Sequence, residues 1–438
     1  MLLWPGAAGG QSGQNSADAW ARCEGPDPDK SISACTALLE SGKEDAENQA
    51  VAFNSRGIAY DEKGQHDQAI ADFNRAIQLE ADYAGAFSNR GNAYAARGEF
   101  DKAMADYNQA IRLKPDDADA FNYRGYANAV TGQLDLAIAD FGHSIQLKPD
   151  NPAAFNNRAN AYAAKGELDF AIIDFGEAIT LKPDYAEAYT NRGNAYSDKR
   201  QLDLAIADYS AALKLNPQDA GTLYSRGIVL LEQRKLDAAV ADFSQAIRIQ
   251  PGMAEAFNDR GIAYRDQGDE QRALADFGQA VKLKPAYADA FYNRGSTYQL
   301  RGRYPPAIAD FNEAIRLNPD HAGALVNRCF ARAMSGQPEQ LALADCNRAL
   351  ALASLDPRTI AIRGLVYLKL HKPQQAIADC DTALSTYPGL ASALYGRGLA
   401  RQMAGDKAGA AADIAAARAI DPGVAGQFAR WGFPAPGP

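Results

Sequence analysis

A 34-residue period runs through most of this chain and restricts it to a repeat fold. An arginine recurs with a constant step of 34 residues from Arg56 to Arg328, and after one inserted residue it returns at Arg363 and Arg397. A fixed period between about 20 and 50 residues indicates a stack of similar supersecondary units. The arginines define eleven copies, in windows 50–83, 84–117, 118–151, 152–185, 186–219, 220–253, 254–287, 288–321, 322–356, 357–390 and 391–424.

Each copy has the pattern of two helices. The first residue of a window is counted as position 1, so that the arginine stands at position 7. Apolar or small residues at positions 4, 8 and 11 predict a first helix that ends at a glycine such as Gly98, and small and aromatic residues predict a second helix from about position 17 to position 30. In the second copy these landmarks are Phe87, Gly91, Tyr94, Ala103, Tyr107, Ala110 and Pro115.

These landmarks resemble the tetratricopeptide repeat family, with its W-x2-L-G-x2-Y, A-x3-F and P pattern, over residues 50–424. The resemblance implies an all-α fold, a right-handed superhelical solenoid of helix-turn-helix units, which contact only their neighbours along the chain. One departure is systematic, because position 7 is usually an apolar leucine and is arginine in every copy here.

The segment before the repeats is divided into two parts. Residues 1–26 form a leader, which lacks the basic start and the apolar core of a complete signal peptide and is interpreted as a remnant of one. Residues 27–49 predict an N-terminal capping helix. Cys23 and Cys35 lie twelve residues apart, a separation that allows a disulfide in an oxidising compartment, although two unrelated thiols fit equally well. The layout resembles the start of exported bacterial repeat proteins, which favours the periplasm over the cytoplasm.

The last copies depart from the repeat pattern. Cys346, Cys380 and Ile414 replace the aromatic residue at position 24, and Cys329 replaces the glycine at position 8. We expect these three cysteines to be small buried apolar residues without a redox role. Terminal repeats are usually atypical because one face meets water. Residues 425–438 then predict a C-terminal cap with a tail of proline and glycine.

Position 23 is aspartate in every copy and accompanies the arginine at position 7. A planar guanidinium can hold a carboxylate with two parallel hydrogen bonds, so we predict one structural ion pair per copy, either within a copy or between neighbours. The alternative is an arginine row that binds phosphate or carboxylate ligands. In the central copies the pairs are Arg90 with Asp106, Arg124 with Asp140, Arg158 with Asp174, and Arg192 with Asp208.

Uncharged amides are frequent at positions 5, 6 and 9. If positions 4, 8 and 11 face the second helix, positions 2, 5, 9 and 12 face away from it, toward a groove. Amides there match a peptide backbone and resemble the asparagine ladders of glycosyltransferase-linked members of the family, whereas the alternative is a merely solvated helix face. The predicted groove residues are Asn54, Asn89, Asn92, Asn122, Asn156, Asn157, Asn160, Asn191, Asn194, Asn258, Tyr292 and Asn293.

The groove is expected to change along the chain. Lysine is absent from positions 2 and 5 in the copies compared, unlike in the family members that clamp a terminal carboxylate. Toward copies 6 to 9 the groove gains residues that suit a basic or aromatic segment of a partner: Tyr224, Glu255, Asp266, Asp289, Tyr292 and Leu300.

Charge and motifs restrict the function further. The formal net charge is −9 and no basic run occurs, which argues against nucleic acid and anionic membranes as partners, and no apolar stretch is long enough to span a bilayer. The four histidines form no pair at metal-ligand spacing, and no phosphate loop, nucleophile elbow or cofactor motif is present, so we expect no enzyme activity, metal or cofactor. The sequence therefore predicts a non-enzymatic scaffold that binds an extended peptide segment of another protein. The alternative is a solenoid that self-associates into an assembly.

Overall fold

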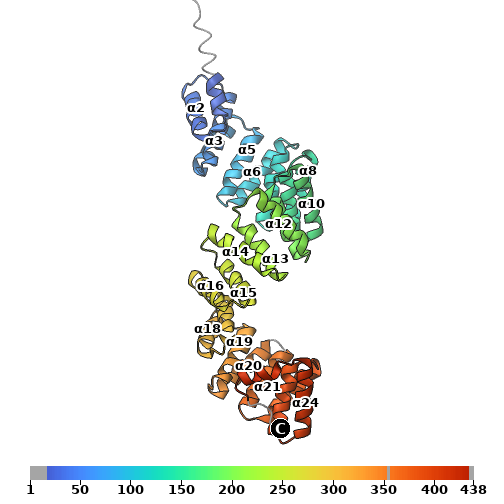
Figure 1. Ribbon diagram of the computed structural model, residues 1–438. Helices are drawn as coiled ribbons and strands as arrows, with labels where there is room; N and C mark the ends of the chain where they lie inside the picture. The colour runs from blue at the N-terminus through green and yellow to red at the C-terminus, as the bar shows by residue number, and fades with distance from the viewer. Residues whose placement is uncertain (1–16, 353–355, 434–438) are drawn as a thin grey trace, which may run out of the picture. The chain divides into compact units, whose positions relative to one another are not determined.

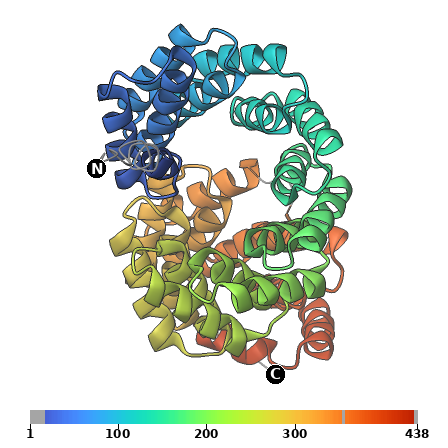
Figure 2. The ribbon, with the colours of Figure 1, turned by 90° about the horizontal axis from the view of Figure 1, so that it is seen from above.

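A computed structural model describes residues 17–352 and 356–433, and every regular element within these ranges is a helix (Figure 1). Most of the helices follow one another in pairs joined by short turns, as both views show (Figures 1 and 2). They group into two units, residues 1–217 and residues 218–438. The predicted all-α fold of repeated helix pairs is confirmed.

The first unit holds copies 1 to 5. A helical segment at 17–23 precedes α2 (Pro28–Glu40). The first helices of the copies are α3 (Ala46–Glu62), α5 (Ala84–Ala96), α7 (Ala118–Val130), α9 (Pro152–Ala164) and α11 (Ala186–Asp198). The second helices are α4 (His66–Leu79), α6 (Phe100–Leu113), α8 (Leu134–Leu147), α10 (Leu168–Leu181) and α12 (Leu202–Leu215).

The second unit holds copies 6 to 11 and a short final helix. Its first helices are α13 (Ala220–Glu232), α15 (Ala254–Asp266), α17 (Ala288–Leu300), α19 (Ala322–Met334), α21 (Pro357–Lys369) and α23 (Ala391–Met403). Its second helices are α14 (Leu236–Ile249), α16 (Glu270–Leu283), α18 (Tyr304–Leu317), α20 (Glu339–Leu352), α22 (Pro373–Thr386) and α24 (Lys407–Ile420). The chain then forms α25 (Val424–Arg430).

A glycine and an aromatic ring bring the two helices of a copy together. In the second copy, a methyl group added to Gly91 would lie 2.6 Å from Cε1 of Tyr107, closer than two carbon atoms can approach. Alanines that are completely buried, such as Ala86, Ala93 and Ala103, occupy positions 3, 10 and 20 of the same copy. Small residues therefore let the helices approach closely, and the ring at position 24 fills the space between them.

Left-handed backbone at position 15 follows the first helix in all eleven copies. Gly98 has a φ of 76° there, a conformation that glycine adopts without steric cost. Three copies place another residue at this position, and Arg200, Arg234 and His371 have φ values of 62°, 60° and 56°. The same turn is thus kept in these copies at the cost of an unfavourable backbone conformation.

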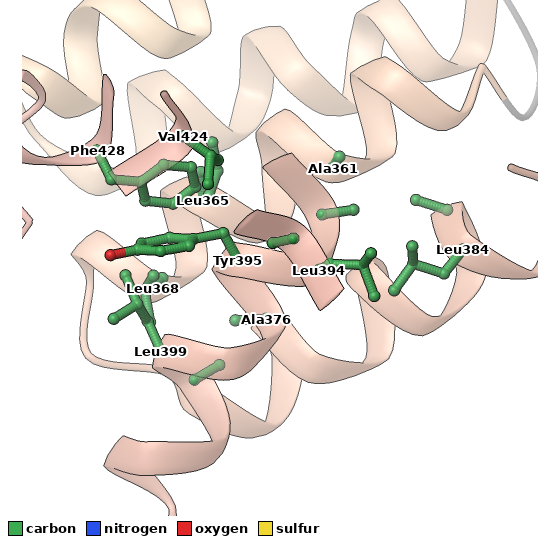
Figure 3. Packing of buried hydrophobic residues seen from close by; sticks show 14 of the residues in the cluster. Ala361, Leu365, Leu368, Ala376, Leu384, Leu394, Tyr395, Leu399, Val424 and Phe428 are labelled. Carbon is green, nitrogen blue, oxygen red and sulfur yellow. The ribbon is translucent and has the colours of Figure 1, made fainter. Parts of the chain in front are cut away.

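The final helix α25 covers the end of the second unit. Phe428 is 1% exposed, and its ring centroid lies 4.6 Å from that of Tyr395 on α23. Figure 3 shows Phe428 and Val424 beside Leu365 of α21 and above Tyr395. This layer of apolar side chains shields the last repeat from water.

Candidate interaction surface

The arginine at position 7 and the aspartate at position 23 of the same copy form a bidentate ion pair. Nε of Arg90 donates to Oδ2 of Asp106 at 2.8 Å, and Nη2 donates to Oδ1 at 2.7 Å. The aspartates are 5–8% exposed. The structure has the same pairing in all eleven copies: Arg56 with Asp72, Arg90 with Asp106, Arg124 with Asp140, Arg158 with Asp174, Arg192 with Asp208, Arg226 with Asp242, Arg260 with Asp276, Arg294 with Asp310, Arg328 with Asp345, Arg363 with Asp379, and Arg397 with Asp413.

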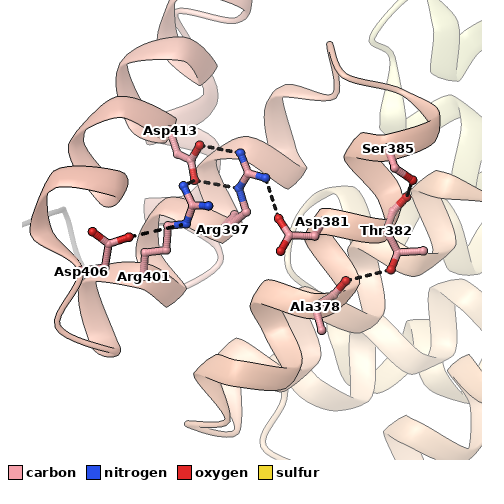
Figure 4. A network of polar contacts seen from close by, with 8 residues as sticks. All are labelled: Ala378, Asp381, Thr382, Ser385, Arg397, Arg401, Asp406 and Asp413. Carbon is pink, nitrogen blue, oxygen red and sulfur yellow. Dashed lines mark hydrogen bonds and ion pairs between the residues drawn. The ribbon is translucent and has the colours of Figure 1, made fainter.

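The third guanidinium nitrogen reaches the preceding copy. Nη1 of Arg90 donates to Oδ1 of Asn74 at 2.6 Å, and the guanidinium carbon lies 5.4 Å from the ring centroid of Phe87. In the last copy, Nη1 of Arg397 donates in the same way to Asp381 (Figure 4). The hydrogen bonds that Arg90 donates to the carboxylate of Asp106 raise the pKa of Arg90 above its ordinary value. Each such arginine therefore joins the two helices of its own copy and also the copy before it.

The asparagines at positions 5 and 6 hydrogen-bond to each other between copies. Nδ2 of Asn89 donates to Oδ1 of Asn54 at 3.0 Å. The equivalent bonds run from Asn157 to Asn122 at 3.1 Å, from Asn191 to Asn156 at 3.4 Å, and from Asn293 to Asn258 at 3.0 Å. These amides therefore fix the spacing of neighbouring first helices.

The expectation that position 5 is open to the groove is wrong for three of the predicted residues. Asn54, Asn156 and Asn258 are 7%, 1% and 3% exposed. Position 5 lies only about 40° from position 9 around the helix axis, at 100° per residue. This small rotation turns it toward the first helix of the next copy, where water is excluded.

Position 9 is exposed or half-buried in the three copies of the first unit where it is asparagine. Asn160 on α9 and Asn194 on α11 are exposed, and Asn92 is half-buried. The amide oxygens of Asn92 and Asn194 each accept a hydrogen bond at 2.8 Å from the hydroxyl of the tyrosine at position 24, Tyr107 and Tyr209. Their amide nitrogens are not used in these bonds. Position 9 thus supplies amide donors on the surface of adjacent first helices.

The acidic residues expected in the groove of copies 6 to 9 are mostly paired inside the chain. Lys284 Nζ lies 2.6 Å from Glu255, Arg234 Nη1 lies 2.5 Å from Asp266, and His321 Nε2 lies 3.5 Å from Asp289. Tyr292 is half-buried, and its ring centroid lies 4.7 Å from that of His321. This stretch therefore offers a basic partner less free negative charge than its sequence suggests.

A half-buried carboxyl that the sequence pattern did not single out lies in the same stretch. Asp259 stands at position 6, where other copies have asparagine, and Oδ2 accepts a hydrogen bond from Tyr224 Oη at 2.7 Å. Burial raises the pKa of Asp259 above the ordinary value of an aspartate. Only its replacement of the asparagine at that position could have signalled it.

Four cysteines form two disulfides. Cys23 and Cys35 are bonded with their Cα atoms 4.8 Å apart, which ties the segment 17–23 to α2. Cys329 and Cys346 are also bonded, with Cα atoms 5.5 Å apart, so the expectation that they are separate buried thiols is wrong. They occupy positions 8 and 24, which are in contact in every helix pair of this kind; Cys380 is free and buried. That spacing was the signal that could have identified the second disulfide.

Across residues 17–352 and 356–433, no group of histidine, cysteine and acidic side chains is arranged to hold a metal ion. Within the same ranges, no helix has both the length and the apolar content that crossing a bilayer requires.

The repeated helix pair, its glycine and aromatic packing and its bonds between copies define a helical repeat scaffold. The TPR repeat pattern matches residues 57–96, 91–129, 131–166, 159–199 and 261–300, and the Tetratricopeptide repeat pattern matches residues 190–254, 288–321 and 363–425. The chain belongs to the tetratricopeptide repeat family. Members of this family are generally protein-interaction scaffolds and are typically non-catalytic, so the family implies protein partners.

Several solved structures are similar to all or part of this chain. YrrB, described as a TPR protein with an unusual peptide-binding site, is 28% identical over 42% of this chain and 95% of YrrB, with a TM-score of 0.38. A tetratricopeptide repeat protein from Parabacteroides merdae is 19% identical over 56% of this chain and 97% of its own, with a TM-score of 0.44. A chain of the APC/C hetero-tetramer Cut9–Hcn1 is 15% identical over 94% of this chain and 92% of its own length, with a TM-score of 0.48. A comparison with curated proteins gave no match.

Proposed function

We propose that the chain is a non-catalytic scaffold that binds an extended segment of a partner protein along the first helices of residues 1–217. The observation that carries this proposal is the pair Asn160 and Asn194, exposed at equivalent places of the adjacent helices α9 and α11. A side-chain amide offers two donors and an acceptor, which suit the N–H and C=O groups of an extended backbone. The exposed ring of Tyr126, at the same position of α7, adds apolar contact area.

The other predicted groove asparagines have a supporting role in this proposal. Asn89, Asn157 and Asn191 donate to position 5 of the preceding copy and so hold the first helices at a constant spacing. A binding surface is most effective when its donors are held in place before the ligand arrives. The bonds between copies therefore pre-organise the exposed row.

Crosslinking with mass spectrometry tests the proposal. The natural protein and the variant Asn160→Ala/Asn194→Ala serve as baits under mild crosslinking. The matched control Gln68→Ala/Gln146→Ala removes two exposed amides from the second helices α4 and α8. We expect one or a few proteins to be crosslinked to the natural protein and to the control, but not to the asparagine variant. If all three baits recover the same proteins, the proposal that the exposed asparagines of this unit bind a partner is wrong.

Self-association is the alternative function, and an apolar ridge favours it. Position 19 carries Leu136, Phe170 and Leu204 on the consecutive helices α8, α10 and α12, with side chains 54%, 57% and 49% exposed. Ile173 of α10, 61% exposed, lies one turn from Phe170. Light scattering across a concentration series distinguishes the two functions. A mass that rises with concentration and is restored to one chain by Phe170→Glu supports assembly.

A further inference from the structure

Position 9 changes character between the two units. In the first unit this row is Ile58, Asn92, Tyr126, Asn160 and Asn194, whereas in the second unit it is Ile228, Ile262, Ser296, Phe330, Leu365 and Leu399. Position 9 is therefore largely polar in residues 1–217 and largely apolar in residues 218–438, where Phe330, Leu365 and Leu399 are buried. The second unit is suited to a different kind of contact.

A cavity of about 440 Å³ lies at the C-terminal end of this apolar row. Its walls come from α17, α19, α21 and α25, through Leu300, Phe330, Leu365 and Trp431. Cavities of about 300–1,000 Å³ are typical of sites that enclose a ligand. Because α25 lies outside the repeats and supplies one wall, this site is specific to the way this chain ends its repeats.

Most of the apolar side chains that line the cavity are packed against one another, but one of them is largely exposed to solvent. The ring of Trp431 packs edge-on against that of Phe330 with centroids 5.1 Å apart, and Leu365 is 2% exposed. Leu300, in contrast, is 75% exposed, more than any other large apolar side chain in the described residues. The exposed side chain of Leu300 beside the packed rings of Phe330 and Trp431 is the arrangement expected where a partner protein buries an apolar surface.

Two arginines add positive charge to the lining of this cavity. Arg358 of α21 and Arg430 of α25 are exposed, and within the described residues neither forms an ion pair. Asp356 is the acid nearest to Arg358 along the chain, and it caps α21 by accepting from the backbone N of Thr359 at 2.8 Å. Arg332, Arg363 and Arg397 of the same unit are each bound to an aspartate. Arg358 attracts the nearby carboxylate of Asp356, but among the described residues the cavity lining itself holds two exposed guanidinium groups and no carboxylate, which makes the site locally cationic.

We propose that this cavity binds a short acidic segment of a partner protein through one bulky apolar side chain. The apolar side chain enters between Leu300, Phe330 and Trp431, and carboxylates on either side of it pair with Arg358 and Arg430. Guanidinium groups bind carboxylates with charge-assisted hydrogen bonds, which sets the charge of the partner segment. This proposal extends the interaction function to residues 218–438 and depends on none of the exposed asparagines of the first unit.

Selection from a random peptide library displayed on phage tests the proposal with the full chain as bait. The test variant is Arg358→Glu/Arg430→Glu. The matched control Arg248→Glu/Arg418→Glu makes the same charge change at exposed places of α14 and α24, away from the cavity. We expect peptides with an apolar residue flanked by aspartate or glutamate to be enriched on the natural protein and on the control, and not on the test variant.

Synthetic versions of the enriched peptides give the affinity by fluorescence anisotropy. We expect binding to weaken at least tenfold with Arg358→Glu/Arg430→Glu and with Leu300→Asp, and to weaken as salt is added, while the melting temperatures remain close to that of the natural protein. Enrichment of peptides without acidic residues, no enrichment, or equal affinity for the test variant would each overturn the proposal. A chain mass that doubles in light scattering and returns to one chain with Leu300→Asp would instead assign the cavity to a second copy. Asn160→Ala/Asn194→Ala should leave the affinity unchanged, so this test is separate from that of the first unit.

Discussion

Cys329 and Cys346 form a disulfide at the two places where the second copy packs the ring of Tyr107 against Gly91. A covalent bond thus replaces an aromatic contact between the two helices of a copy. We predict that the protein unfolded in guanidinium without reductant has one reactive thiol, that of Cys380. After reduction, all five cysteines should react. Thiol titration with Ellman's reagent measures this, and three or more reactive thiols before reduction would contradict it.

The same disulfide is expected to stabilise the ninth copy. It closes a loop of 17 residues, so Cys329→Ser/Cys346→Ser should lower the free energy of unfolding by about 3 kcal/mol. Denaturant unfolding of the variant, compared with the natural protein, measures the loss. A variant as stable as the natural protein would show that the bond does not form in solution.

The ion pairs are predicted to be structural because their carboxylates are buried. Arg192→Ala leaves the carboxylate of Asp208, 6% exposed, without its partner and should cost about 3–5 kcal/mol. The control Arg316→Ala removes an exposed pair with Glu313 within one helix and should cost about 0–1 kcal/mol. Urea unfolding compares the two, and equal losses would argue against the structural role.

Two asparagines four residues apart on α9 are predicted to differ in their effect on stability. Asn156 is 1% exposed and accepts a hydrogen bond from Asn191, so Asn156→Ala should cost about 1–3 kcal/mol. Asn160 is exposed, and Asn160→Ala should change stability by no more than about 0.5 kcal/mol. Thermal melting of both variants is the measurement; similar melting temperatures would place position 5 at the surface after all.

Asp259 is predicted to make stability depend on pH. Burial raises its pKa in the folded chain above the value in the unfolded chain, so the folded state binds more protons and loses stability as pH rises through that interval. Asp259→Asn, which restores the residue found in other copies, should therefore be more stable than the natural protein at pH 7. The difference should shrink as the pH falls below about 4, near the ordinary pKa of aspartate. Unfolding curves at pH 3.5 and pH 7 test this, and a difference that is the same at both would contradict it.

Much of the fold could be predicted because the period assigns every residue a position. The matching rows at positions 7 and 23 predicted ion pairs such as Arg90 with Asp106, but only the structure shows that they form within a copy. The face of the first helix was harder to predict. This helix has one buried side against its own second helix and another against its neighbours, and the second side carries hydrogen-bonded amides such as Asn156 instead of apolar residues. A hydrophobic pattern therefore identifies the side that packs against the second helix, but it does not identify the side that packs against neighbouring first helices.

The cavity at the C-terminal end could not be predicted from the period for a related reason. Leu300 and Arg358 belong to different copies, and Trp431 lies outside the repeats. These three residues lie close together because α25 packs against the first helices of earlier copies. No local sequence pattern predicts that packing. Position 9 did contain the relevant information, because its change from asparagine to Phe330 and Leu365 is visible in the sequence.

Whether an arginine can donate to the preceding copy depends on one residue, the acceptor at position 25. Asn74, Asn108 and Ser244 accept there, whereas Gly142, Gly176 and Gly278 have no side chain to do so. The junctions after these glycines hold an amide bond instead, from Asn157 to Asn122, from Asn191 to Asn156 and from Asn293 to Asn258. Loss of that single amide should therefore open the stack at these junctions first, and hydrogen exchange and proteolysis should begin there.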